Sequence, residues 1–190
     1  MTANLIDHPQ FRHWLTYVKN LGWASIAFAG TTKGMTPGQR AALKDIFRVT
    51  LEHVDKWQFH HEDFPGADIE AHELALVQKP PAVVVLHPVV FDFRARGTTG
   101  FAVEREVQPK GMRYAEMINE SHVLIVAPSS KSGANFEMIK LYAKKARIGT
   151  ITLPVEQRPL TLRERERAVA EFRREHPNQE IPDLSKFYGN

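Results

Sequence analysis

Short apolar runs alternate along the chain with longer amphipathic stretches, and this alternation limits the fold more than any other feature. The runs are short, rich in β-branched residues, apolar on both faces and bounded by Gly or Pro. They are Ala24–Gly30, Ala82–Pro88, His122–Pro128 and Gly149–Pro154, with Lys56–His61 as a weaker fifth. Strands that are buried on both faces of a parallel sheet have this pattern. The sequence therefore predicts a parallel sheet of about five strands.

Helical patterns separate these strands. They cover Thr36–Asp55, Gly66–Gln78, Lys110–Glu120 and Ala134–Ala146. Strand–helix alternation implies right-handed crossovers, so we expect a single Rossmann-like, doubly wound α/β sheet with helices on both faces. Extra helices are expected near Pro9–Asn20 and Leu162–His176. The predicted organisation is a helical extension at 1–22, the α/β domain at 23–156 and a charged helix and tail at 157–190.

Composition excludes several classes of protein. No cysteine is present, which excludes disulfides, thiolate catalysis and zinc–thiolate sites. The sequence has no run of about 18 apolar residues, and its first residues lack the pattern of a secretory signal, so we expect a cytoplasmic protein with no membrane contact. The net charge of +3 is too small to indicate nucleic acid. The tail "LRERERAVAEFRREH" mixes Arg with Glu, which also argues against nucleic acid.

The stretch "AFAGTTKGMTPGQRAAL" carries two signals. Thr36 and Pro37 are typical of a helix N-cap and first helical position. Gly30, Thr31 and Thr32 come directly after a predicted strand, where free amides and hydroxyls can bind a phosphate. The local pattern is neither a Walker loop nor GxGxxG, and it fits a phosphate contact and a plain strand-end turn equally well.

The segment "HHEDFPGADIEAH", His60–His72, combines histidines with carboxylates. Asp68 and His72 are four residues apart and could share a helix face, but this pair alone is a weak metal signal. Helix capping by Asp63 or Asp68 explains the segment better, so we expect no metal.

Two further features follow the later strands. Glu137 lies in the first turn of a predicted helix, where it could act on a sugar or could simply complement the helix dipole. The connection from Pro88 to Pro109 is long and contains three Phe, which is typical of a functional loop. Such a loop would lie at the carboxyl ends of the strands, where ligands bind in doubly wound sheets.

In order along the chain, these motifs resemble the SLOG superfamily, which includes the lonely-guy phosphoribohydrolases and DprA-like domains, and in particular its small phage and bacterial members. The resemblance rests on "FAGTTKGMTPGQ", "HHEDFPGADIEAH", "RYAEMINESHVLIVAP" and "SGANFEMIKLYAKKARIGTITLP" and covers roughly Ile26–Pro154. It implies a nucleotide-binding domain with Glu137 as the catalytic residue and no cofactor. The ligand-binding residues that it implies are Gly30, Thr31, Thr32, Lys33, Asp63, Gly66, Asp68, Arg113, Ser132, Gly133 and Asn135.

The sequence departs from the family pattern at several positions. Glu62 replaces a glycine, Tyr114 an asparagine and His122 an aspartate, and Ala134-Asn135 replaces a Gly-Thr pair. These departures affect catalysis more than binding, because reacting groups need accurate placement. Two functions follow: cleavage or transfer of the N-glycosidic bond of a nucleotide, or a non-catalytic sensor of a nucleotide-derived signal. A homodimer is also expected.

Overall fold

The computed structural model describes residues 9–88, 102–129, 134–155, 170 and 174. In this part of the chain a sheet of six strands, all parallel, has the order β4-β3-β2-β1-β5-β6. The strands are β1 (Trp23–Gly30), β2 (Lys56–His61), β3 (Val83–Leu86), β4 (Val103–Glu104), β5 (Val123–Ala127) and β6 (Gly149–Thr152). The predicted Rossmann-like α/β fold is confirmed.

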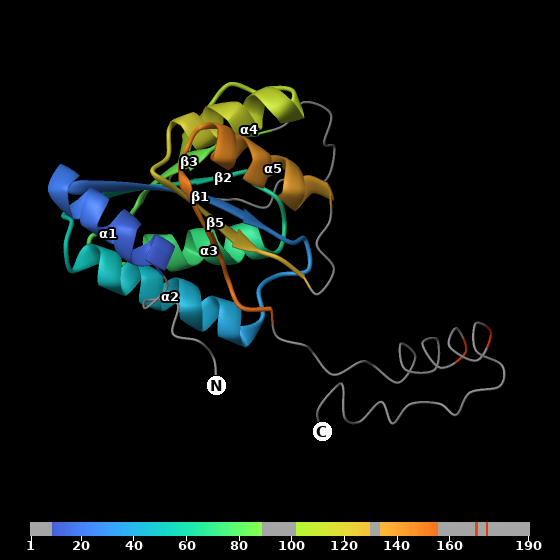
Figure 1. Cartoon of the computed structure of the whole chain (residues 1–190), viewed down its shortest axis with the longest axis horizontal. Helices are drawn as coiled ribbons and strands as arrows, with labels where there is room; N and C mark the ends of the chain where they lie inside the picture. Colours follow the sequence, from blue (N-terminus) through green and yellow to red (C-terminus); the bar gives the residue numbers. More distant parts are fainter. Residues whose placement is uncertain (1–8, 89–101, 130–133, 156–169, 171–173, 175–190) are drawn as a thin grey trace. The chain divides into compact units, whose positions relative to one another are not determined.

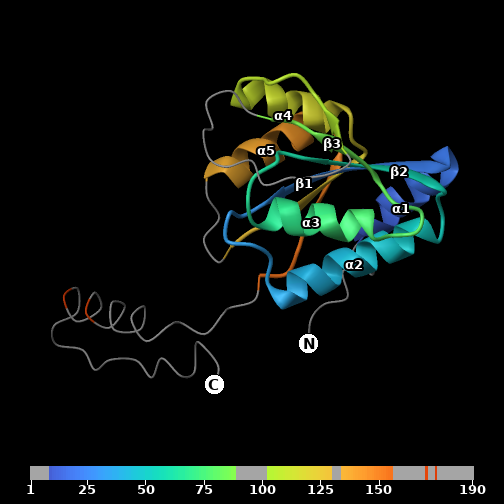
Figure 2. The same ribbon diagram turned by 180° about the vertical axis from the view of Figure 1, so that it is seen from behind.

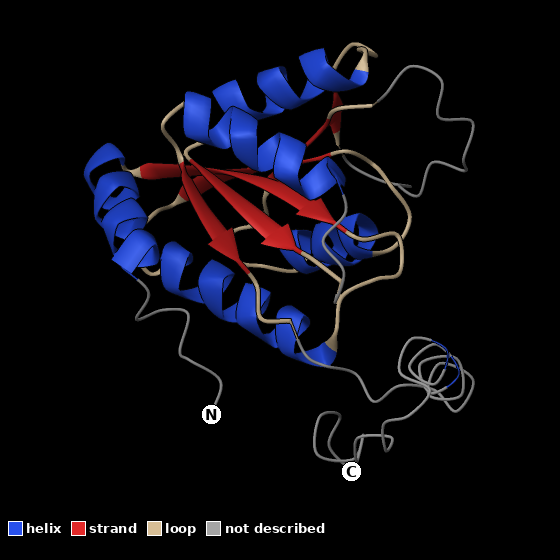
Figure 3. Ribbon diagram, turned by 45° about the vertical axis from the view of Figure 1, so that its right-hand side comes forward, coloured by secondary structure: helices blue, strands red, loops and turns tan. Residues whose placement is uncertain are grey.

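Helices cover both faces of the sheet (Figure 1). On one side are α1 (Pro9–Leu21), α2 (Pro37–Leu51) and α3 (Ala67–Leu76), and on the other are α4 (Lys110–Asn119) and α5 (Ala134–Lys145). The view from behind shows α4 and α5 again together, on the opposite side of the strands from α2 and α3 (Figure 2). Figure 3 shows the strands lying between the two helical layers.

The two faces of the sheet form two apolar cores, and β1 contributes to both. Ile26 and Phe28 belong to the core under α1, α2 and α3, whereas Ala27 and Ala29 belong to the core under α4 and α5. Side chains alternate between faces along a strand, so a strand buried on both sides is apolar at every position. This explains the unbroken apolar run that predicted β1.

The sheet has one strand more than the five that the apolar runs indicate. The sixth strand, β4, lies inside the connection predicted as a loop from Pro88 to Pro109, of which residues 89–101 lie outside the described residues. Both residues of β4 are exposed, and the strand pairs only with β3 at the edge of the sheet. A strand of two exposed residues has no apolar run, so the pattern that found the other strands could not find it.

The chain divides into two compact units, Met1–Val155 and Glu156–Asn190. In the second unit Ala170 and Arg174 lie in a helix, and the rest of the predicted helix Leu162–His176 lies outside the described residues. In the first unit α1 buries Phe11, Trp14 and Val18 in the larger core. No helix among the described residues is both long enough and apolar enough to cross a membrane.

The predicted start of α2 is confirmed as a capping box. The Thr36 hydroxyl accepts a hydrogen bond from the Gln39 amide at 3.2 Å, and the Gln39 side chain accepts one from the Thr36 amide at 3.0 Å. We expect Thr36→Ala to lower the free energy of unfolding by about 1 kcal/mol because it leaves helix amides unpaired. Urea denaturation would measure this, and Thr36→Ser, which keeps the hydroxyl, should retain the stability. Equal losses in both variants would contradict the capping role.

Candidate functional site at the carboxyl edge of the sheet

From β1 the chain adds strands first toward one edge of the sheet, β2 to β4, and then toward the other, β5 and β6. The candidate site lies at the point of this change, between β1 and β5. Gly30 and Ala127 are paired at the carboxyl ends of these two strands. Ligands of doubly wound sheets bind outside such a reversal, between the loops that leave the two strands. Here the Gln39 side chain donates a hydrogen bond of 2.8 Å to the carbonyl oxygen of Pro128, which connects the start of α2 to the end of β5.

The loop after β1 is held against the start of α3. The Gly30 amide donates to Asp68 Oδ1 at 3.0 Å, and the Thr31 carbonyl accepts from the Ala67 amide at 2.9 Å. The loop also closes on itself, since the Lys33 amide donates to the Thr31 hydroxyl at 3.2 Å. The Gly30 amide therefore already binds a carboxylate of the chain. Thr32 and Lys33 are exposed at the tip of the loop.

Glu70 fixes the far end of the same loop. Its Oε2 accepts a hydrogen bond from the Met35 amide and lies 2.9 Å from Arg40 Nη2. The loop from Gly30 to Thr36 is thus connected to α3 at Asp68, at Ala67 and at Glu70. These contacts hold the predicted phosphate-binding segment in one conformation, which lowers the entropic cost of binding a ligand there.

The loop after β2 and the start of α3 carry the predicted ligand-binding residues Asp63 and Asp68. Asp63 and Asp68 are both buried, and Asp63 has a φ of 66°, in the left-handed region. Non-glycine residues in that region are uncommon and are often found at functional sites. Burial and the charge of Glu62 raise the pKa of Asp68, while hydrogen bonds from the backbone amides of Gly30, Phe64 and Glu62 act against this shift. The carboxyl ends of β1 and β2 therefore share an acidic, mostly dehydrated wall.

Arg113 is completely buried and forms an ion pair with Glu62, whose side chain is 8% exposed. The guanidinium group also lies over the rings of Tyr114 and Phe64, with its Cζ 4.7 Å and 5.5 Å from the two ring centroids. Among the described residues, Arg113 Nε and Nη1 have no hydrogen-bond partner. Burial raises the pKa of Glu62, and the charge of Arg113 and a hydrogen bond from Tyr114 act against this shift.

Glu62 and Tyr114 were not predicted as site residues, although both are departures from the family pattern. The structure brings these two departures together around Arg113. A carboxylate in place of glycine supplies the counter-charge of the arginine, and a phenol in place of asparagine supplies a hydrogen bond to that carboxylate. Two replacements that complement each other chemically were the available signal for this cluster.

The predicted ligand-binding residues before and at the start of α5 are described only in part. Ser132 and Gly133 lie outside the described residues, and Asn135 is the second residue of α5, with its side chain outside the described part. The Glu137 side chain is 66% exposed, and its Oε1 lies 3.3 Å from Lys140 Nζ. The described contacts of Glu137 are those of a solvated helix residue. They connect it to none of Gly30, Asp68 or Arg113.

Comparisons with known proteins identify no family for this chain. Among the solved structures that match is the X-ray structure of TM1055, a Northeast Structural Genomics Consortium target. The two chains are 13% identical, the match covers 67% of this chain and 72% of TM1055, and the TM-score is 0.47. At this level the likeness carries no argument about fold or function. No protein-family model matches the sequence, and no curated protein matches it either.

Proposed function

We propose that the carboxyl edge of the sheet binds a nucleotide or a nucleotide-derived ligand, as in the small SLOG proteins that the sequence resembles. The observation that carries this proposal is the buried guanidinium of Arg113, two of whose nitrogens lack a partner among the described residues. Buried polar groups are nearly always hydrogen-bonded, and leaving one unpaired costs about 1–3 kcal/mol. A phosphate oxygen matches the forked donors of arginine. The Arg113 side chain is 0% exposed, so a ligand phosphate would supply the missing acceptors once binding moves the groups that cover the guanidinium.

The rest of the edge supports the same ligand class. Lys33 and Thr32 are exposed on a loop that is otherwise fixed, so they are available to an anionic group. The buried carboxyl of Asp68 lies behind the same loop, and carboxyl groups accept hydrogen bonds from ribose hydroxyls. A cation on the loop and a hydrogen-bond acceptor behind it are the groups that a nucleoside phosphate needs. Dimerisation remains a prediction from the sequence.

Binding can be tested with a panel of nucleoside phosphates and ADP-ribose, by thermal shift and isothermal titration calorimetry. We expect Lys33→Ala to weaken binding about tenfold, since a hydrogen bond to a charged group contributes about 1.5 kcal/mol. Lys56→Ala is the matched control, because Lys56 is an exposed lysine at the amino end of β2. No ligand-dependent shift across the panel, or equal losses in the two variants, would contradict the proposal.

Between the two functions, the sensor is favoured by the surroundings of Glu137. An exposed carboxylate paired with Lys140 lacks the dehydrated setting of a catalytic carboxylate. We therefore expect the wild-type protein to bind a nucleotide without releasing its base, as followed by chromatography of the reaction mixture. Base release that is lost in Glu137→Gln, with binding retained, would instead establish an N-glycosidic-bond hydrolase or transferase.

A further inference from the structure

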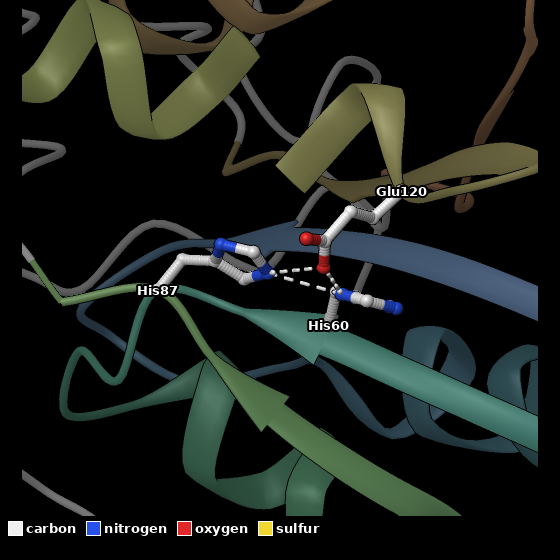
Figure 4. Close-up of side chains that lie close together, drawn as sticks. All are labelled: His60, His87 and Glu120. Atoms are coloured by element: carbon white, nitrogen blue, oxygen red, sulfur yellow. Dashed lines mark hydrogen bonds and ion pairs between the residues drawn. The ribbon is translucent and has the colours of Figure 1, made fainter. Parts of the chain in front are cut away.

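A second polar cluster lies between the sheet and α4. It consists of His60 on β2, His87 just after β3 and Glu120 at the carboxyl end of α4, and their side chains point toward one another (Figure 4). His60 Nδ1 lies 3.0 Å from His87 Nε2, and Glu120 Oε2 lies 3.7 Å from the first nitrogen and 3.9 Å from the second. Both imidazoles are completely buried, and the Glu120 side chain is 30% exposed.

The hydrogen bonds around His60 determine which of its nitrogens carries the proton. The Ser25 hydroxyl donates its one hydrogen to the carbonyl oxygen of Glu120, at 2.6 Å. It must therefore accept a hydrogen bond from His60 Nε2, which lies 3.0 Å from Ser25 Oγ. With its proton on Nε2, a neutral His60 directs the lone pair of Nδ1 into the cluster.

The same reasoning applies to His87. Its Nδ1 lies 3.1 Å from Glu116 Oε2, and an ionised carboxylate can only accept, so Nδ1 carries the proton. A neutral His87 then directs the lone pair of Nε2 at that of His60 Nδ1. Two lone pairs at 3.0 Å, with a carboxylate oxygen beside them, repel one another unless a cation lies between them.

A metal ion satisfies this arrangement better than a shared proton. A proton would bridge the two nitrogens alone, whereas Glu120 Oε2 also lies within 4 Å of both. Three ligands about 2.0–2.2 Å from one ion, at tetrahedral angles, lie roughly 3.3–3.6 Å apart. The observed separations of 3.0, 3.7 and 3.9 Å each lie about 0.1–0.3 Å outside this range, which small side-chain movements would correct. The outward N–H groups are Nε2–H of His60, which donates to Ser25, and Nδ1–H of His87, which donates to Glu116. Metal-binding histidines usually donate their other N–H in this way, and the bond orients the ring toward the metal.

Arg105 completes the surroundings of the cluster. Its Nε and Nη2 both donate to Glu120 Oε2, at 3.2 Å and 3.0 Å, which orients the carboxylate. The two donors belong to one guanidinium group and can share one lone-pair side of Oε2, which leaves the other side facing the imidazoles. We propose that His60, His87 and Glu120 bind a divalent transition metal ion of the zinc class, with a fourth position left for water or a ligand.

This proposal goes beyond the nucleotide site and does not depend on it. The sequence predicted no metal for the segment His60–His72, and His60 is the one residue of that segment in the proposed site. His87 and Glu120 come from other parts of the chain, so no spacing motif indicated the set. Among the described residues this is the one group of three histidines or carboxylates whose ligand atoms converge.

Metal binding can be measured directly on the full-length protein after treatment with a chelator. We expect one equivalent of Zn²⁺ to bind in isothermal titration calorimetry, and one equivalent of Co²⁺ to give the visible absorption of four-coordinate cobalt. His60→Gln and His87→Gln should each weaken binding at least 100-fold. Glu116→Gln, which changes the partner of His87, should weaken it about 10–100-fold.

Two control variants distinguish the loss of a metal-binding histidine from the loss of a histidine elsewhere in the protein. His72→Gln removes a buried histidine that pairs with His61, 2.9 Å away, and His53→Gln removes an exposed one. Both should bind metal as the wild type does, and circular dichroism checks that each variant is folded. If His60→Gln is unfolded, Glu120→Gln and the wild-type cobalt spectrum decide the question. Wild-type protein that binds neither ion, or binding that is unchanged in the folded ligand variants, would overturn the proposal.

Discussion

Replacing Arg113 with methionine is expected to lower the free energy of unfolding by about 3–5 kcal/mol at neutral pH, because it leaves a buried carboxylate without its partner. The Arg113 side chain is 0% exposed and that of Glu62 is 8% exposed, so water cannot replace the lost guanidinium. Methionine keeps most of the apolar stem of the side chain and removes the guanidinium group, whose Cζ lies over the rings of Phe64 and Tyr114. The loss should therefore report mainly the charged group rather than a cavity.

The destabilisation of Arg113→Met should depend on pH, and the shifted pKa of Glu62 determines the direction of that dependence. Burial raises the pKa of Glu62 above its usual 4.5, and the Arg113 charge opposes that shift, so Arg113→Met should raise the pKa further. A carboxyl whose pKa is higher in the folded state stabilises the fold below its unfolded pKa, and this stabilisation is lost as the pH rises through the folded pKa. The destabilisation should therefore be smallest near pH 4.5 and grow toward neutral pH.

A double variant completes this test. Glu62→Gln combined with Arg113→Met removes both charges, and we expect it to recover most of the stability at pH 8, because neutral replacements of a buried ion pair cost little. Urea denaturation of the wild type, the single and the double variants at pH 5 and pH 8 would measure these differences. A loss below about 1 kcal/mol in Arg113→Met that does not change with pH would show that the pair is not buried in solution.

The core of the fold could be predicted because its signals are local. Four of the five predicted strands are apolar runs, and the run on β1 is apolar throughout since Ile26 and Ala27 face different cores. The N-cap of α2 could also be predicted, because Thr36 and Pro37 are neighbours in sequence, whereas the part that Gln39 plays in the cap was not predicted. The edge strand β4 was missed since it is exposed and carries no such run.

The site was less predictable because its contacts join distant segments. Gly30 and Asp68 were both predicted as site residues, but the bond between them, across 38 positions, was not. The sequence assigned Arg113 to a ligand anion, and the structure places Glu62 against it. Complementary charges 51 positions apart, at 62 and 113, have no spacing that a single sequence reveals; only the fold brings them together.

The second large effect is expected at Gly66, where any side chain would collide with the loop after β1. Gly66 has a φ of +100°, and a Cβ atom there would lie 2.6 Å from the carbonyl oxygens of Thr31 and Thr32. These are backbone atoms of a loop that is already held at Gly30 and Glu70, so they cannot move away cheaply. We expect Gly66→Ala to lower the free energy of unfolding by about 3 kcal/mol or more, from backbone strain and overlap together.

Substitutions at two other glycines distinguish the cost of backbone strain from the cost of steric overlap. Gly22 has a φ of +73°, but a methyl group added there would have no atom within 4 Å, so Gly22→Ala should cost only the backbone strain of about 1–2 kcal/mol. A Cβ at Gly149 would meet only Val123, at an ordinary 4.0 Å, so Gly149→Ala should be close to neutral. Chemical denaturation should therefore show the largest loss of stability in Gly66→Ala, a smaller loss in Gly22→Ala and the smallest in Gly149→Ala. Equal losses at Gly66 and Gly22 would mean that the loop yields, and that Thr31 and Thr32 are not held in place for a ligand.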